Sequence, residues 1–204
     1  MIDVSEYQGH INWTKVRKSG VKVAAIKAGE GLYEKDLLFD YNYPAAVSAG
    51  VLACPYFYAH PSESAKAQAR HFVRIVGEAR MKARTGRLGL DLEVGEGLSN
   101  EAVQDWALEF CAVIDPLIRC KMIVYSYSAF LPGLGKSLVD HPLWVANYND
   151  RKGVPRSEIG EWKPRSVIAH QYTSSGTCPG IEGKVDRSYR YTHTLRRFRN
   201  GRFW

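Results

Sequence analysis

Apolar residues occur along this chain in short runs that alternate with longer amphipathic stretches. Runs rich in Val, Ile and aromatic residues predict β-strands, and the stretches with helical spacing predict α-helices. We expect strands at Met1–Val4, Val23–Lys27, Val51–Tyr58, Leu88–Glu93, Met122–Tyr127, Leu143–Asn147, Val167–Tyr172 and Lys184–Asp186. We expect helices at Trp13–Ser19, Asp40–Ala49, Ser62–Ala83 and Asn100–Leu117, with Ser99 or Asn100 as the cap of the last.

The order of these elements predicts the fold class. Strands that alternate with helices through the first two thirds of the chain favour a parallel sheet over a sandwich. The later strands are joined by loops that contain Gly and Pro and have little room for helices. We therefore expect an α/β fold, a compact (β/α)-type barrel of eight strands with partial helical cover. A length of 204 residues without a linker or repeat predicts one domain over residues 1–204, with a basic tail at about 190–204.

Two acids interrupt the apolar run of residues 88–94, at Asp91 and Glu93. Side chains alternate between the faces of a strand, so both carboxylates point to one side, about 7 Å apart along the backbone. Burying an unpaired carboxylate costs several kcal/mol, which a merely structural strand has no reason to accept twice. Paired acids suit cleavage of a glycosidic bond, in which one protonates the leaving oxygen. A metal site or a salt-bridged strand end is the alternative interpretation.

In a barrel of this type, the catalytic residues lie at the carboxyl ends of the strands. Asp3 is near the end of the first predicted strand, Asp91 and Glu93 are at the end of the fourth, and Asp186 is at the end of the eighth. The first and eighth strands are neighbours in a closed barrel, so we expect four acids at one mouth. Aromatic rings, whose flat faces can pack against a sugar, are expected at the same level: Tyr56, Tyr58, Tyr125, Tyr127, Trp144 and Tyr148.

Composition narrows the classes of protein. An apolar content of 45% with 24% charged residues is ordinary for a globular protein, and no apolar run approaches the roughly 20 residues that span a bilayer, so we expect no membrane insertion. A net charge of +7 predicts a polyanionic partner, either nucleic acid or an anionic cell wall. The chain lacks helix-turn-helix, zinc-finger and ribonucleoprotein motifs, so we expect no nucleic acid.

Cysteine and histidine positions give no metal or cofactor signal. The four cysteines are widely spaced, without a Cys-x-x-Cys pair, and buried free thiols are their default interpretation. No His, Asp and Cys cluster has metal-ligand spacing, so we expect neither a metal nor a cofactor. The amino terminus lacks the features of a secretory signal. We therefore expect either a mature secreted form or a chain that leaves the cell by another route, such as a phage lysin released through a membrane lesion.

Five segments together resemble a known family. In chain order they are Asp3–Gly9 with Ile11–Trp13, Ala25–Gly31, Asp91–Glu93, Leu143–Tyr148, and Gln171–Tyr172 before Gly180–Asp186. They are similar to glycoside hydrolase family 25, the Chalaropsis-type lysozymes common among bacterial autolysins and phage endolysins. The resemblance runs in register from residue 2 to about residue 189, and five motifs in register are a specific signal.

The resemblance implies a single flattened TIM-like barrel of eight strands with fewer than eight helices. It also implies cleavage of the β-1,4 bond between N-acetylmuramic acid and N-acetylglucosamine in the peptidoglycan of the bacterial cell wall. Separately from the resemblance, we expect a monomer. By position, Glu93 resembles the general acid, and Asp3, Asp91 and Asp186 resemble the other acids of the site. The residues implied to contact the substrate are Tyr56, Tyr58, Tyr125, Trp144, Tyr148 and Gln171.

The chain departs from the family's usual motifs in places, and its sequence leaves open the route of attack on the sugar and two rival functions. The family often has Tyr-His-Phe where this chain has Tyr56–Tyr58, and Trp-Gln-Tyr where it has His170–Tyr172. The anomeric carbon can be attacked by an aspartate, by water or by the substrate's 2-acetamido oxygen. The Asp-x-Glu arrangement resembles acetamido-assisted hexosaminidases, which favours the third route with Asp91 orienting the acetamide. The rival functions are a non-catalytic glycan-binding barrel and a chitinase-like hexosaminidase.

Overall fold

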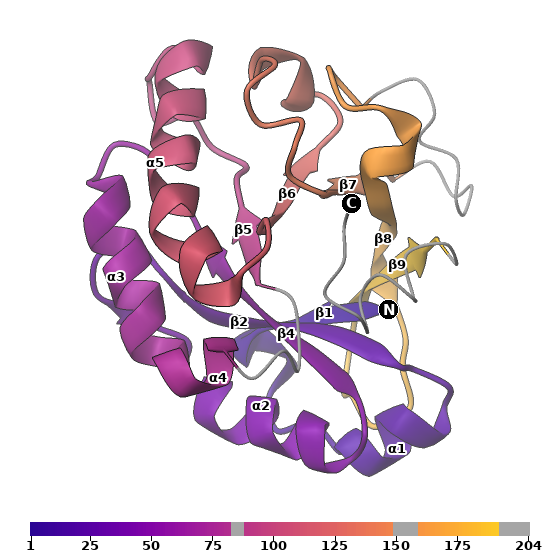
Figure 1. Cartoon of the computed structure of the whole chain (residues 1–204). Helices are drawn as coiled ribbons and strands as arrows, with labels where there is room; N and C mark the ends of the chain where they lie inside the picture. Colours follow the sequence, from indigo (N-terminus) through magenta and orange to yellow (C-terminus); the bar gives the residue numbers. More distant parts are fainter. Residues whose placement is uncertain (83–87, 149–158, 192–204) are drawn as a thin grey trace.

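The computed structural model describes residues 1–82, 88–148 and 159–191, and its strands form a closed barrel (Figure 1). Each strand pairs with the next in the order β1-β2-β4-β5-β6-β7-β8-β9, and β9 pairs with β1 to close the ring. The expected eight-stranded α/β barrel is therefore confirmed. These strands are β1 (Ile2–Val4), β2 (Val23–Glu30), β4 (Leu52–Tyr58), β5 (Gly89–Asp91), β6 (Ile123–Tyr127), β7 (Leu143–Ala146), β8 (Val167–Gly176) and β9 (Val185–Arg190).

Helices cover only part of this barrel, as the sequence predicts. Figure 1 shows them along the side formed by β2, β4 and β5, whereas β8 and β9 carry no α-helix in the described ranges. Ser99 caps α5, because its hydroxyl oxygen accepts a hydrogen bond of 3.2 Å from the Ala102 N–H. The α-helices are α1 (Trp13–Lys18), α2 (Phe39–Ser48), α3 (Ala65–Val76), α4 (Glu78–Lys82) and α5 (Asn100–Ile118), and the 3₁₀ turns are η1 (Glu6–Gln8), η2 (Leu131–Gly133) and η3 (Pro164–Ser166).

The direction of the last strand differs from the prediction. The expected strand Lys184–Asp186 is instead β9 (Val185–Arg190), which runs antiparallel to both β8 and β1. Only residues 177–184 join β8 to β9, and this connection is too short for the crossover that a parallel pair requires. The expectation that Asp186 ends its strand was therefore wrong. Asp186 lies near the beginning of β9, and the reversed direction brings it to the same rim as the carboxyl ends of the other strands.

Two further boundaries differ from the sequence prediction. The single helix expected over Ser62–Ala83 begins only at Ala65 and is divided into α3 and α4 by Gly77, whose φ of +83° is typical of the residue that ends a helix. A short additional strand, β3 (Glu34–Lys35), pairs with the end of β2. Two residues are too few to give a recognisable alternation in the sequence.

The alternation of strand residues separates two apolar regions. Leu90 and Leu92 are fully buried in the larger region between the barrel and its helices, where the rings of Phe57, Phe72 and Phe110 lie 5.2 to 6.4 Å apart. A second cluster fills the barrel interior below the mouth. Its buried members are Val23, Ala25, Cys54, Ile123, Tyr125, Trp144, Ala146, Ile168 and Ala169.

Three further predictions concern the cysteines, membrane-spanning helices and the basic tail. The four cysteines are free thiols, with Cys54, Cys111 and Cys178 buried and Cys120 half-buried. Over residues 1–82, 88–148 and 159–191, no helix is both long and apolar enough to cross a bilayer. The basic tail expected at about 190–204 lies almost entirely outside the described residues.

Candidate active site

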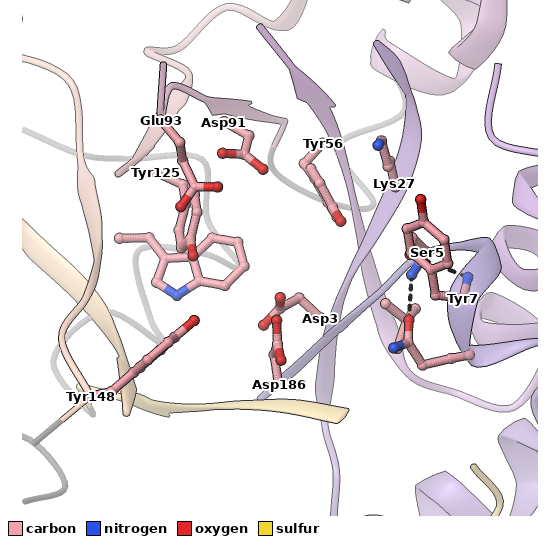
Figure 2. Close-up of a pocket in the computed structure, with 13 residues that line it drawn as sticks. Asp3, Ser5, Tyr7, Lys27, Tyr56, Asp91, Glu93, Tyr125, Tyr148 and Asp186 are labelled. Atoms are coloured by element: carbon pink, nitrogen blue, oxygen red, sulfur yellow. Dashed lines mark hydrogen bonds between the residues drawn. The ribbon is translucent and has the colours of Figure 1, made fainter. Parts of the chain in front are cut away.

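A cavity of about 270 Å³ opens at the carboxyl ends of the parallel strands, and all four predicted acids line it (Figure 2). Asp91 and Glu93 come from the β5 side, whereas Asp3 and Asp186 come from β1 and β9 across the barrel. The four acids of this mouth, separated by up to 183 positions in the chain, therefore face one space. The cavity is lined by Asp3, Val4, Ser5, Tyr7, Gln8, Lys27, Tyr56, Asp91, Glu93, Tyr125, Trp144, Tyr148 and Asp186.

The backbone beyond β5 holds Asp91 and Glu93 toward this cavity. Asp91 is the last residue of β5, and its carbonyl accepts a hydrogen bond of 2.9 Å from the Ala59 N–H. The Leu92 N–H donates to the Tyr125 carbonyl at 2.9 Å, so extended pairing continues past the end of the strand. Because Leu92 is fully buried on the helix side, Asp91 and Glu93 on either side of it point into the mouth, as their spacing predicts.

Asp3 and Asp186 form a pair of facing carboxyl groups. They stand directly opposite each other in the antiparallel pairing of β1 and β9, and Figure 2 shows their carboxyl groups side by side. Burial, and next the charge of Asp186, raise the pKa of Asp3 well above its ordinary value. Burial also raises the pKa of Asp186, although the facing Asp3 carboxyl acts in the opposite direction. Asp3 Oδ2 is buried without a hydrogen-bond partner, so this pair favours retention of a proton on Asp3.

The buried amide of Gln171 on β8 connects this acid pair to two tyrosines. Its Oε1 accepts hydrogen bonds of 2.8 Å from the hydroxyls of both Tyr125 and Tyr148. Its Nε2 donates to Asp3 Oδ1 at 2.9 Å and to Asp186 Oδ2 at 3.4 Å. Gln171 is only 1% exposed and does not line the cavity, so it positions the groups that do.

The environment of Asp91 and Glu93 favours their protonated forms. Burial raises the pKa of Asp91 well above its ordinary value, and the charges of Glu93 and Asp3 act in the same direction. Burial is also the main cause that raises the pKa of Glu93, with a smaller effect in the same direction from the charge of Asp186 and an opposing effect from the nearby Tyr125 hydroxyl. Glu93 is half-buried, so a protonated carboxyl there stays accessible to a ligand in the mouth.

The predicted aromatic residues divide into those that line the cavity and those that do not. Tyr56, Tyr125, Trp144 and Tyr148 line it, and the Trp144 ring packs at 4.5 Å between centroids against that of Tyr125. Tyr58 shares a face with Tyr56 but is not among the residues that line the cavity.

Sequence reasoning missed several residues that line the cavity, most importantly Lys27. Its side chain projects from β2 into the mouth and forms an ion pair of 2.8 Å with Glu30, and its Nζ lies 5.4 Å from the centre of the Tyr58 ring. A charged residue at the inward-facing position of an apolar strand was the available signal. Ser5, Tyr7 and Gln8 were missed because they belong to the 3₁₀ turn η1 and its N-cap, which follow β1.

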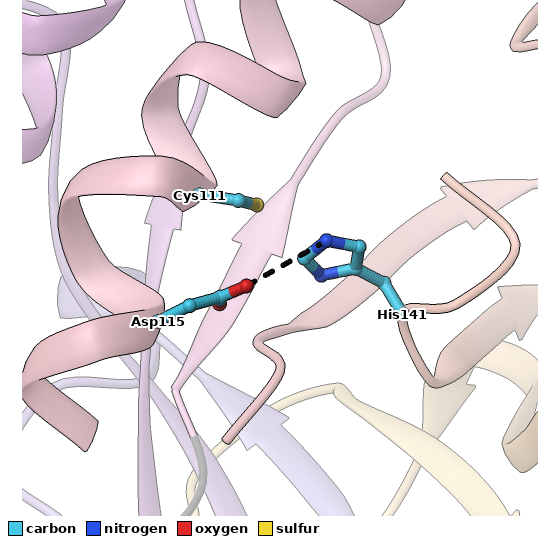
Figure 3. A group of neighbouring side chains, drawn as sticks. All are labelled: Cys111, Asp115 and His141. Atoms are coloured by element: carbon cyan, nitrogen blue, oxygen red, sulfur yellow. Dashed lines mark ion pairs between the residues drawn. The ribbon is translucent and has the colours of Figure 1, made fainter. Parts of the chain in front are cut away.

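The acids of the mouth are not the group most suited to a metal. Among the described residues, three ligand-type side chains whose ligand atoms all lie within 4.8 Å of one another are found elsewhere, at Cys111, Asp115 and His141 (Figure 3). The mouth instead combines four carboxyl groups, an ammonium group and aromatic rings. Such a set can transfer protons and hold a polar ligand with apolar faces, as a sugar has.

Comparison with solved structures supports the fold. The chain superposes on the bacterial lysozyme from Streptomyces coelicolor with a TM-score of 0.85 and 28% identity, covering 98% of this chain and 96% of that one. It superposes on a family 25 glycosyl hydrolase from Bacillus anthracis with a TM-score of 0.82 and 22% identity, covering 98% and 91% of the two chains. The second likeness bears on the fold alone.

Sequence comparison finds relatives over nearly the whole chain. Lysozyme M1 from Streptomyces globisporus is 31% identical over 198 residues, which cover 92% of this chain and 66% of that protein. An autolytic lysozyme from Clostridium acetobutylicum is 30% identical over 188 residues, which cover 91% and 53%. The chain thus spans between about half and two thirds of the length of these curated relatives. The family described as "Glycosyl hydrolases family 25" matches residues 2–181, and the chain belongs to this family.

Proposed function

We propose that this chain is an N-acetylmuramidase that cleaves the β-1,4 bond between N-acetylmuramic acid and N-acetylglucosamine in bacterial peptidoglycan, with Glu93 as general acid. The observation that carries the proposal is the position of Glu93, a half-buried carboxyl with a raised pKa in a mouth that holds three further acids. Membership of family 25 and the names of the two similar lysozymes support the reaction and its substrate.

The first step of the proposed reaction is a proton transfer. Asp91 is more deeply buried than Glu93, so before a sugar binds, the proton that the two share resides mainly on Asp91. An acetamide N–H of the substrate that donates to Asp91 stabilises its charged form and moves the proton to Glu93. Glu93 then protonates the glycosidic oxygen as the bond from that oxygen to the anomeric carbon breaks.

In the second step, a nucleophile attacks the anomeric carbon, where positive charge develops. We assign the attack on the anomeric carbon to the acetamido oxygen of the same sugar, with the ionised Asp91 holding the acetamide N–H. Glu93, now a carboxylate, takes a proton from the water that opens the resulting ring. Two displacements at one carbon give net retention of configuration. The second acid pair, Asp3 and Asp186, carries one negative charge and stabilises the positive charge across the cavity.

Aromatic residues at the edge of the mouth are placed to contact the glycan. Tyr7 is 85% exposed and Tyr148 is 56% exposed, yet both line the cavity. Exposed rings beside hydrogen-bonding acids suit a sugar, whose C–H face is apolar and whose edges are polar. The net charge of +7 supports a further attraction to anionic polymers of the wall.

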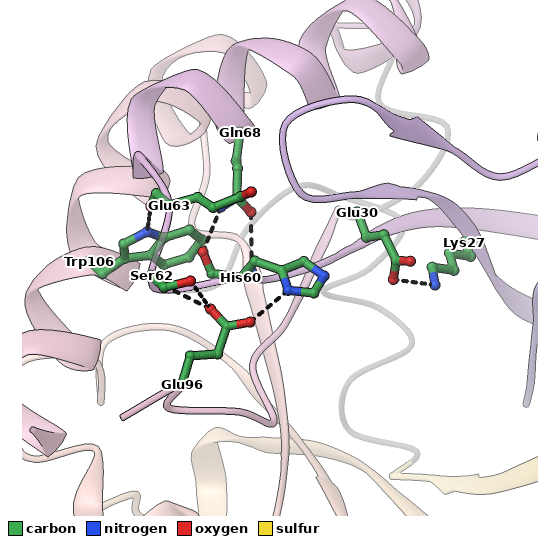
Figure 4. A network of polar contacts seen from close by, with 8 residues as sticks. All are labelled: Lys27, Glu30, His60, Ser62, Glu63, Gln68, Glu96 and Trp106. Atoms are coloured by element: carbon green, nitrogen blue, oxygen red, sulfur yellow. Dashed lines mark hydrogen bonds and ion pairs between the residues drawn. The ribbon is translucent and has the colours of Figure 1, made fainter. Parts of the chain in front are cut away.

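The loop that carries Glu93 is fixed by Glu96, which clamps it to the loop between β4 and α3 (Figure 4). The Glu96 carboxylate accepts hydrogen bonds of 2.8 Å from the Ser62 N–H and 2.6 Å from the Ser62 hydroxyl, and pairs with His60 Nδ1 at 2.7 Å. Glu96 has a φ of +48°, which is strained for a residue other than glycine. This clamp compensates for the strain and positions the general acid.

The rival functions lack such direct support. A non-catalytic glycan-binding barrel has no need for a carboxyl whose environment raises its pKa at the accessible edge of the mouth. A chitinase-like hexosaminidase usually has additional aspartates before the acid, at positions that are Arg87 and Gly89 in this chain.

Replacing Glu93 tests the general acid. Glu93→Gln keeps the shape of the side chain but removes its transferable proton, so kcat on purified cell wall should fall by about 10²- to 10⁴-fold, with KM and the melting temperature nearly unchanged. The matched control is Glu101→Gln, at an exposed position in the first turn of α5, which should retain wild-type kcat. A Glu93→Gln enzyme with a near wild-type rate would show that another group donates the proton.

The Glu96 clamp makes a prediction about pH. Burial acts to raise the pKa of Glu96, but the hydrogen bonds from Ser62 and His60 outweigh it and lower the pKa below the ordinary value of 4.5. A lowered pKa in the folded state adds stability at pH values above 4.5 that is lost as the pH falls through the lowered pKa. Wild type should therefore melt at a higher temperature than Glu96→Gln at neutral pH, and the difference should shrink in acid. A difference that grows in acid contradicts the clamp.

The products of digestion show which glycosidic bond is cleaved and whether the anomeric configuration is retained. After digestion of purified peptidoglycan and reduction, mass spectrometry should find the new reducing end on N-acetylmuramic acid. Proton NMR during the first minutes should show the retained anomer. A new end on N-acetylglucosamine would favour the hexosaminidase, and an inverted first product would exclude the acetamido route.

A further inference from the structure

Three side chains with the ligand atoms of a metal site converge away from the cavity (Figure 3). Cys111 and Asp115 lie one turn apart on α5, so they share a face of the helix. His141 lies two residues before β7, and the fold brings its ring to this face. The sulfur, carboxylate and imidazole ligand atoms all lie within 4.8 Å of one another.

This cluster is at the opposite end of the barrel from the catalytic acids. Met122, which contacts both Asp115 and His141 through its backbone, immediately precedes β6, and His141 precedes β7. Both positions are at the amino ends of parallel strands, whereas Asp91 lies at the carboxyl end of β5. The cluster therefore does not belong to the active site.

The hydrogen bonding of His141 indicates which of its two ring nitrogens carries the proton. Its Nδ1 contacts the Met122 carbonyl oxygen at 3.2 Å, and because that oxygen can only accept, Nδ1 carries the proton. With the proton on Nδ1, the other nitrogen of the neutral ring, Nε2, presents a lone pair. Nε2 faces Asp115 Oδ2 at 3.8 Å, which is beyond hydrogen-bond distance. His141 is 2% exposed, so its Nε2 and Asp115 Oδ2 converge at a buried position where a metal ion could join them.

We propose that Cys111 Sγ, Asp115 Oδ2 and His141 Nε2 bind a divalent transition metal ion, with the chemistry of zinc. One sulfur, one nitrogen and one oxygen ligand favour zinc over calcium or magnesium, and water can complete a tetrahedral site. The contact from Nδ1 to the Met122 carbonyl is the outer hydrogen bond that orients a metal-bound histidine. Ligand atoms around zinc are about 3.5 Å apart, so the three side chains need to move together by about 1 Å.

Asp115 has one oxygen for the protein backbone and one for the metal. Its Oδ1 accepts a hydrogen bond of 2.9 Å from the Met122 N–H. Its Oδ2 forms an ion pair of 3.2 Å with Lys121, whose side chain is 38% exposed. A metal ion would displace this ammonium group into solvent, so Lys121 competes with the metal. Binding also removes a proton from the Cys111 thiol, whose pKa is raised by burial and next by the charge of Asp115, so affinity should increase with pH.

A metal at this position would have a structural consequence. The segment between β6 and β7 spans residues 128–142 and contains only the 3₁₀ turn η2 (Leu131–Gly133). Its end at His141 would be fastened through the metal to α5, the longest described helix of the barrel. The ion would therefore stabilise the fold and leave the catalytic acids unchanged.

Cobalt provides a direct test, because a thiolate bound to Co²⁺ has a charge-transfer absorption that unligated cysteine lacks. The full chain, freed of metal with a chelator and kept reduced, is titrated with Co²⁺ and then with Zn²⁺. We expect a saturable thiolate-to-cobalt band at one equivalent, its loss when zinc displaces cobalt, and a higher melting temperature with zinc. The absence of the band in wild type would overturn the proposal.

Variants assign the ligands. Cys111→Ala and Asp115→Asn should abolish or greatly weaken the band, whereas Cys120→Ala, which removes the cysteine just after α5, should leave it intact. Lys121→Gln should increase the affinity for cobalt, because it removes the competing ammonium group. Circular dichroism confirms that each variant is folded before titration. A band that survives in Cys111→Ala, or disappears in a folded Cys120→Ala, would show that the metal is held elsewhere.

Discussion

Four carboxyl groups share the mouth of one barrel, and burial makes it costly for all of them to be ionised together. Asp3 and Asp91 are 8% and 7% exposed, and each has a second acid beside it whose charge raises its pKa further. Lys27 is the one basic side chain among the described residues that line the cavity, so positive charge there is too scarce to balance four carboxylates. The mouth therefore retains protons, and a retained proton is what a general acid needs.

The fold produces this crowding through the direction of one strand and through one buried amide. Because β9 runs antiparallel to its neighbours, Asp186 enters the mouth at the start of its strand and stands opposite Asp3. Gln171 then fixes this pair and also accepts hydrogen bonds from Tyr125 and Tyr148, which stand near Glu93. One buried amide thus orients both this acid pair and the two tyrosines. In the proposed reaction, a substrate contact at Asp91 shifts a proton from Asp91 to Glu93 without moving the backbone.

Local periodicity was enough to predict much of this site, whereas features set by pairing between distant segments were not accessible from the sequence. Alternation along a strand correctly placed Asp91 and Glu93 on one face, because that rule depends only on neighbouring residues. The position of Asp186 was predicted correctly, but for a reason that was wrong, since strand direction depends on which partners a strand finds. Lys27 was missed although a charged residue within an apolar strand was a visible signal, and His141 was missed because 26 positions of sequence separate it from Asp115. The contacts of such residues exist only after the barrel closes.

The most direct test of this account is a carbon NMR titration of the Asp and Glu carboxyl groups in the full chain, with Asp91→Asn and Glu93→Gln used to assign the resonances. The account predicts that the Asp91 and Glu93 pair takes up a proton at a pH clearly above the ordinary values of 3.8 and 4.5 for these groups. It also predicts that an N-acetylated sugar in the mouth moves that proton toward Glu93. If both carboxyl groups titrate at or below their ordinary values, the mouth does not retain the proton and the central claim is wrong.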